Sequence, residues 1–83
     1  ATAQALIDEV EAYLASAQNL SATDRGTLET GIALLKQFMN AGNYEMTRVY
    51  TERLRYNYEV ILAANPPAAM PEPEPGETSG GIG

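Results

Sequence analysis

Apolar residues recur at helical spacing in three separate segments of the chain. In the first segment, from residue 3 to about 18, they form one face with the acidic residues outside it; the face consists of Leu6, Ile7, Val10, Tyr13, Leu14 and Ala17. Steps of three and four residues place side chains on the same side of an α-helix. The pattern therefore predicts a helix with a single buried face, packed at the periphery of the domain.

The second segment, residues 22–40, carries a wider apolar face made of Leu28, Ile32, Leu34, Leu35, Phe38 and Met39. Ser21 is suited to cap the first amides of this helix, with Asp24 three residues later in a capping-box arrangement. The triplet that ends at Ser21 also matches a glycosylation pattern, but we favour the cap. Gly31 lies within the apolar face, where glycine costs up to ~1 kcal/mol. This indicates either close approach of a neighbouring backbone or a site that tolerates glycine.

A third helix is predicted over residues 44–64. Gly42 can adopt the left-handed conformation that ends the preceding helix, and Asn43 can cap the next one. At the other end, Asn65 and the prolines after it stop the helix. Because the connection is short, the second and third helices are expected to be antiparallel neighbours.

The third helix has two apolar faces. One contains Thr47, Tyr50, Leu54, Tyr58 and Ile61, and the other contains Met46, Val49, Tyr56 and Val60, with Arg53 and Asn57 between the two. In a three-helix bundle, both faces pack against the other helices. Alternatively, the second face points outward and forms a protein-binding patch around Arg53, because tyrosine, methionine and arginine are favoured at such surfaces. Both interpretations remain open on the sequence alone.

Charged residues of alternating sign follow one stripe of the third helix: Glu45, Arg48, Glu52, Arg55 and Glu59. Residues three and four apart on a helix are neighbours, so we expect the two arginines to be paired with acids. Binding of a nucleic acid requires unpaired cations beside exposed aromatic rings. The pattern therefore favours a bundle helix over a nucleic-acid grip.

The chain from residue 66 onward is rich in proline, glutamate and glycine, and this composition predicts an extended acidic tail.

The expected fold class is all-α. Residues 1–65 are expected to form a small three-helix bundle, or a helical hairpin with a packed N-terminal helix, and the tail, 66–83, follows. The residues we expect to bind a partner are Met46, Val49, Arg53, Tyr56 and Val60 on the third helix and Pro71, Pro73 and Ile82 in the tail.

The stretch "LLKQFMNAGNY" resembles the first helix and turn of a tetratricopeptide unit, through Leu34, Phe38, Gly42 and Tyr44. The resemblance ends there, because Thr47 and Leu54 replace small residues of that family and the third helix is several residues too long. There is no second copy, and a solenoid needs at least three repeats. We interpret the stretch as a generic short helical hairpin.

Composition narrows the possible chemistry. The 83 residues include no cysteine and no histidine, so thiolate and imidazole ligands, and imidazole acid–base catalysis, are excluded. The carboxylates of Glu9, Glu45, Glu52 and Glu59 lack the histidines that bundle metal sites generally use. No apolar run approaches the ~20 residues of a membrane span. We expect no enzyme activity, no cofactor, no metal and no small-molecule substrate.

A formal net charge of −6 is opposite to that of most nucleic-acid binders. We therefore expect a cytoplasmic, non-enzymatic structural or assembly subunit that docks on a protein partner, or on copies of itself, through the third helix and the tail. Minor proteins of viral particles fit this profile, although no motif supports that assignment. The alternative is an acidic regulatory binder or inhibitor that occupies a basic surface of a partner protein.

Overall fold

The computed structural model describes residues 2–66 and contains three helices and no strand within that range. Helix α1 spans Ala3–Ser16, α2 spans Ala22–Asn40 and α3 spans Tyr44–Ala64. The predicted all-α fold class is confirmed. The predicted tail, 66–83, lies almost entirely outside the described residues. None of the helices in the described part combines the length and apolarity needed to cross a membrane.

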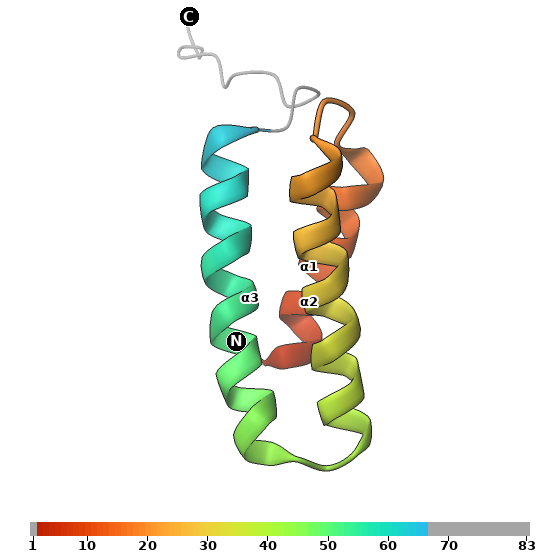
Figure 1. Ribbon diagram of the computed structural model, residues 1–83, viewed down its shortest axis with the longest axis vertical. Helices are drawn as coiled ribbons and strands as arrows, with labels where there is room; N and C mark the ends of the chain where they lie inside the picture. Colours follow the sequence, from red (N-terminus) through yellow and green to blue (C-terminus); the bar gives the residue numbers. More distant parts are fainter. Residues whose placement is uncertain (1, 67–83) are drawn as a thin grey trace, which may run out of the picture.

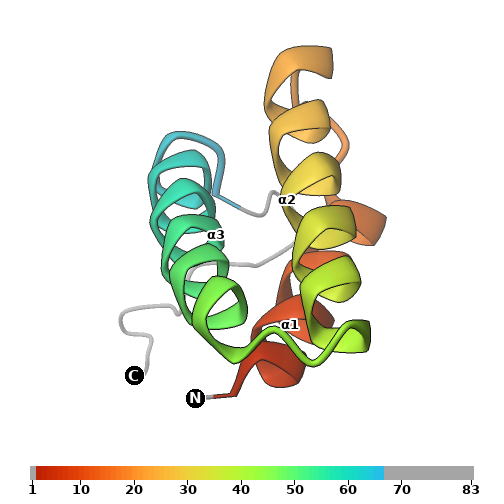
Figure 2. The same cartoon turned by 60° about the horizontal axis from the view of Figure 1, so that its bottom comes forward.

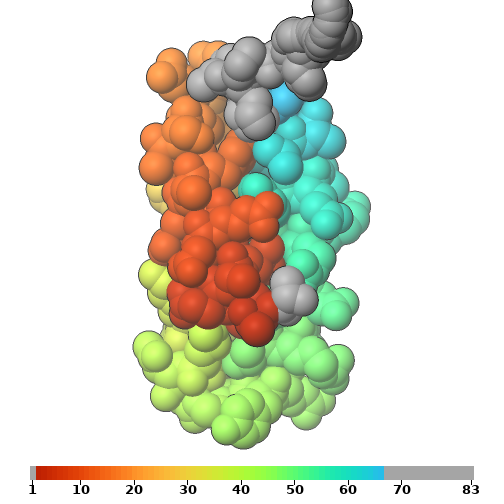
Figure 3. Space-filling model, turned by 180° about the vertical axis from the view of Figure 1, so that it is seen from behind, coloured from red at the N-terminus to blue at the C-terminus, as the bar shows by residue number. Residues whose placement is uncertain are grey.

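Helices α2 and α3 form an antiparallel hairpin, and α1 packs against one side of it (Figure 1). Figure 2, with the α2–α3 turn brought forward, shows α1 lying against the pair from one side. Seen from behind, α1 covers the seam between α2 and α3, and the turn of the hairpin extends past it (Figure 3). The opposite side of the hairpin is therefore not covered by α1.

Side-chain caps define where the helices begin. The side chains of Thr2, Ser21 and Asn43 accept hydrogen bonds from the amides of Ala5, Asp24 and Met46, each at 3.1 Å. These caps satisfy backbone donors that have no partner inside the helix. Gly42 has a φ of 70°, the left-handed conformation expected between α2 and α3. Asn43 and Gly42 thus set the tight turn that makes the two helices antiparallel.

The core sits where the three helices meet. Its buried members are Leu6, Ile7, Val10, Tyr13 and Leu14 of α1, Leu28, Ile32 and Leu35 of α2, and Leu54, Tyr58 and Ile61 of α3. All of these residues belong to the faces predicted to be apolar. The rings of Tyr13 and Tyr58 meet edge to face, with centroids 5.6 Å apart, a preferred geometry for aromatic pairs.

Two expectations about the helices need correction. Helix α1 ends at Ser16 rather than near Gln18, because Ala17 adopts an extended backbone conformation while its amide donates to the Tyr13 carbonyl at 2.8 Å. The close neighbour of Gly31 is a side chain and not a backbone. A Cβ atom at that position would lie 3.0 Å from Cδ1 of Leu54, so the missing side chain makes room for a core leucine.

Candidate functional site: an outward strip on the third helix

Five residues predicted to bind a partner form one strip along the outer side of α3: Met46, Val49, Arg53, Tyr56 and Val60. Their spacing alternates between three and four residues, the pattern by which one helix presents a continuous seam to another. The side chains of Tyr56 and Val60 are 67% and 51% exposed, whereas Met46 and Val49 are partly buried. We call these five residues the outer strip.

The local sequence fixes the direction in which the outer strip points. Leu54, Tyr58 and Ile61 bury the opposite side of α3 against the other two helices. At the C-terminal end, the Asn65 side chain donates to the Ile61 carbonyl at 3.0 Å, and the Asn65 carbonyl accepts from the Tyr13 hydroxyl at 2.7 Å. With both its inner face and its end attached to the bundle, α3 cannot rotate to bury Tyr56.

Arg53 occupies the middle of the outer strip. Its guanidinium carbon lies 5.2 Å from the ring centroid of Tyr50, within the range of a cation–π contact. The Tyr50 ring in turn packs against Phe38 of α2, with centroids 5.1 Å apart. Arg53 is exposed, and this stack places its charged group against the surface of the hairpin while it remains in contact with solvent.

A groove of about 420 Å³ lies between α2 and α3 beside the outer strip, and no residue of α1 lines it. It is lined by Gly26, Thr27, Thr30, Gly31 and Leu34 of α2 and by Tyr50, Arg53, Leu54 and Asn57 of α3. Glycine and threonine make up most of its α2 side, and Leu34, Tyr50 and Leu54 contribute apolar side chains. Arg53 therefore belongs to the outer strip and also lines the groove.

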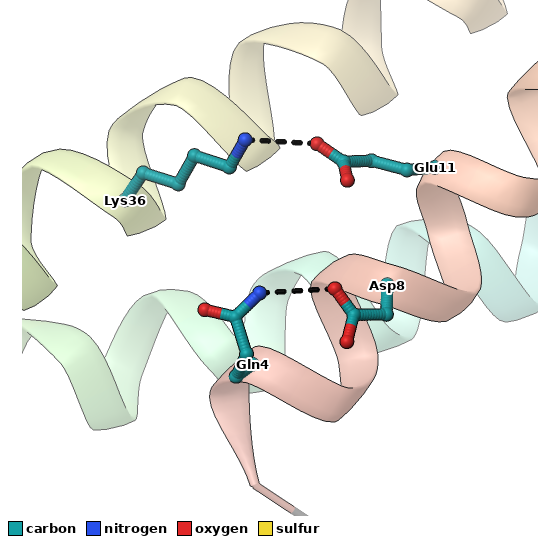
Figure 4. Close-up of polar contacts among 4 residues, drawn as sticks. All are labelled: Gln4, Asp8, Glu11 and Lys36. Carbon is teal, nitrogen blue, oxygen red and sulfur yellow. Dashed lines mark hydrogen bonds and ion pairs between the residues drawn. The ribbon is translucent and has the colours of Figure 1, made fainter.

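The charged stripe of α3 differs from the prediction. Among residues 2–66 the only ion pair joins Lys36 to Glu11 at 2.8 Å (Figure 4), so Arg48 and Arg55 are not paired with the acids expected beside them. Arg48 is exposed and Arg55 is half-buried, and ion pairs at such positions on a helix surface contribute little stability. The expectation of neutralised arginines was wrong.

One exposed ring lies near Arg48. Tyr44 is 86% exposed and precedes Arg48 by one helical turn. Glu45, Glu52 and Glu59 share this side of α3, however, so it carries three acids against two bases. Phosphate groups would meet net negative charge there, which disfavours a nucleic-acid interface.

Arg25 is a structurally important residue that the sequence patterns did not indicate. Its guanidinium donates to the carbonyls of Leu14 at 3.2 Å and Ala17 at 3.1 Å. These carbonyls lie at the C-terminal end of α1, where acceptors lack partners within the helix and a positive charge is favourable. A cation near the N-terminus of α2, where the helix dipole disfavours it, was the available signal that Arg25 has a distant partner.

Two buried tyrosines complete the attachment of α1. The Tyr58 hydroxyl donates to Oε2 of Glu9 at 3.1 Å. Burial, the hydrogen bond to Glu9 and the carboxylate charge raise the pKa of Tyr58 to about 12. Burial and then the charge of Asp24 also raise the pKa of Tyr13. Both hydroxyls are neutral donors at physiological pH, and their hydrogen bonds join α1 to α3 and to the residue that follows it.

Pro71, Pro73 and Ile82, the remaining predicted partner-binding residues, lie outside the described residues. Within residues 2–66 no group of acidic side chains is placed to hold a metal ion. Comparison with protein-family models, with curated proteins and with solved structures found no match to this chain.

Proposed function

We propose that this protein is a non-enzymatic structural or assembly subunit that docks on a protein partner through the outer strip of α3 and through its C-terminal tail. The observation that carries the proposal is the exposure of Tyr56 and Val60 on a helix that already packs into the core through Leu54, Tyr58 and Ile61. Large apolar residues in one line at helical spacing mark a helix-docking surface.

The size of the domain supports the same proposal. A domain of about 65 residues buries only a small core and is marginally stable alone. Binding of a partner to the apolar strip would raise the free energy of unfolding, because the partner binds the folded state. The tail adds three glutamates and four prolines beyond Pro66. Segments of such composition can extend along a neighbouring surface and become ordered on binding.

The alternative is an acidic regulatory binder that covers a basic surface of its partner. It is supported by the net charge of −6 and by three exposed acids of α1, Asp8, Glu9 and Glu11, of which Asp8 lies farthest from the hairpin, since the other two contact it. The two functions differ in their response to salt. Charge-driven binding weakens steeply as ionic strength rises, whereas docking of an apolar helix face changes little.

The test compares two tyrosines of the same helix. The tagged wild-type chain, Tyr56→Ala and Tyr44→Ala are each used to capture partners from the native source across a range of salt concentrations. The Tyr44 variant removes an equally large, even more exposed ring that lies off the outer strip. The proposal predicts that Tyr56→Ala alone loses capture and that wild-type capture survives high salt. Equal capture by both variants, or loss of wild-type capture by salt, would contradict it.

A further inference from the structure

Arg53 is the one charged residue in the outer strip, and it stands at the strip's centre. We infer that Arg53 selects the partner: the outer strip binds an amphipathic helix of a different chain that places a carboxylate beside Arg53, and it rejects a second copy of this chain. The inference rests on the proposed docking through α3 and specifies the chemistry of its partner.

The first argument is the cost of covering Arg53. A helix docked on Tyr56 and Val49 would remove water from the guanidinium between them. Burying a charge without a counter-charge is strongly unfavourable, and no acid within residues 2–66 forms an ion pair with Arg53. The counter-charge must therefore come from the partner. Guanidinium binds carboxylates with two parallel hydrogen bonds, so a glutamate or aspartate is the matching group.

The second argument is geometrical. Tyr50 holds the guanidinium at a defined place, 5.2 Å from its ring centroid, at the edge of the groove. A docking helix can insert an apolar side chain into that groove, which Leu34 and Leu54 line, while its neighbouring residue meets Arg53. Because α1 covers the other side of the hairpin (Figure 3), such a helix would complete a four-helix arrangement.

The third argument excludes a second copy as the occupant. Arg53 is the middle residue of the strip, so pairing two strips over their full length brings both guanidinium groups into the centre of one contact. This holds for parallel and antiparallel pairing alike. Like charges placed together in an interface act against the wrong partner, and the net charge of −6 on each copy adds a long-range repulsion.

Variants of this chain can test whether Arg53 prevents self-association through the outer strip. The variant Arg53→Leu makes the strip continuously apolar, and sedimentation equilibrium measures its self-association. Arg48→Leu is the matched control, since Arg48 is equally a surface arginine of α3 but lies off the strip. We expect the dissociation constant for self-association of Arg53→Leu to fall at least about tenfold below that of the wild-type chain, with no change for Arg48→Leu. Circular dichroism checks that each variant remains helical.

A second experiment tests directly whether Arg53 requires a carboxylate on its partner. Wild-type chain mixed with Arg53→Glu brings an arginine and a glutamate together at the centre of the contact, and we expect this mixture to associate about tenfold more tightly than either chain alone. If Arg53→Leu associates but the mixture shows no gain, the inference about Arg53 is overturned while docking through the strip stands. If Arg53→Leu associates no better than Arg48→Leu, Arg53 is not what keeps two copies apart and the inference fails, whereas the docking proposal is decided separately by the Tyr56→Ala capture test. Wild-type self-association as tight as that of Arg53→Leu would also overturn the inference.

Discussion

Replacing Arg25 tests how α1 is attached to the hairpin. Arg25→Met keeps the apolar stem of the side chain and removes its two hydrogen bonds to the Leu14 and Ala17 carbonyls, which measure 3.2 and 3.1 Å. A hydrogen bond from a charged donor contributes about 1.5–3 kcal/mol when buried. Because Arg25 is only partly buried, solvent screening lowers this contribution, and we expect a total loss of about 2 kcal/mol from the free energy of unfolding.

The assay is urea denaturation followed by circular dichroism. A domain of this size has only a few kcal/mol of stability, so a loss of about 2 kcal/mol moves the midpoint by about 1–2 M urea. Arg48→Met is the control, because Arg48 is exposed and makes no ion pair within the described chain; its effect should stay within about 0.5 kcal/mol. Equal effects of the two variants would refute the assigned role of Arg25 as the group that satisfies the end of α1.

The remaining predictions concern tyrosine ionisation and helix glycines. Between pH 10 and about 12 the unfolded chain releases the Tyr58 proton while the folded chain keeps it; the free energy of unfolding therefore falls with rising pH, by up to about 1.4 kcal/mol per unit. Tyr58→Phe should weaken this dependence of the free energy of unfolding on pH, as measured by urea titrations at several pH values. Tyr13 accounts for the dependence that remains. An unchanged dependence in Tyr58→Phe would contradict the burial of the Tyr58 hydroxyl. Gly26→Ala should raise the free energy of unfolding by about 0.5–1 kcal/mol, since its Cβ would meet no atom within 4 Å. Gly31→Ala should gain less than Gly26→Ala because its Cβ would crowd Leu54; thermal or urea unfolding that ranks the two in the opposite order would contradict the packing around Gly31.

Helix positions and inner faces follow from the sequence because they depend on local signals. Ser21 and Asn43 cap α2 and α3 as expected, and Gly42 takes the left-handed conformation that joins them. The buried residues of each helix belong to the predicted apolar faces. In these places local capping, turn chemistry and hydrophobic spacing all favour the same structure.

Contacts between distant parts of the chain do not follow from spacing. Arg25 reaches carbonyls eight and eleven residues earlier, and Tyr13 donates to a carbonyl 52 residues later. Such bonds depend on how the helices sit on one another. The predicted ion pairs of Arg48 and Arg55 failed for a related reason: helical spacing brings charges within reach of one another but does not fix the direction of each side chain, and pairs near the surface gain little in water.

The candidate site was predicted in part. Sequence spacing identified the outer strip residues but left open whether Tyr56 faced the core. The exposure of Tyr56 settles that question for the described chain. The groove beside Arg53, by contrast, required the packing of α2 against α3, because it is lined by residues of both helices. Whether a partner uses this surface stays a prediction.

The central claim is that the two faces of α3 have different roles. The inner face stabilises the fold by packing into the core, and the outer strip is available to bind a partner. The most direct measurement is the free energy of unfolding of Tyr56→Ala compared with that of Leu35→Ala. Leu35 has no exposed surface, and its truncation should cost about 2–5 kcal/mol, whereas Tyr56→Ala should stay within about 0.5 kcal/mol of the wild-type chain. A Tyr56→Ala variant as destabilised as Leu35→Ala would place Tyr56 in the core and contradict the account.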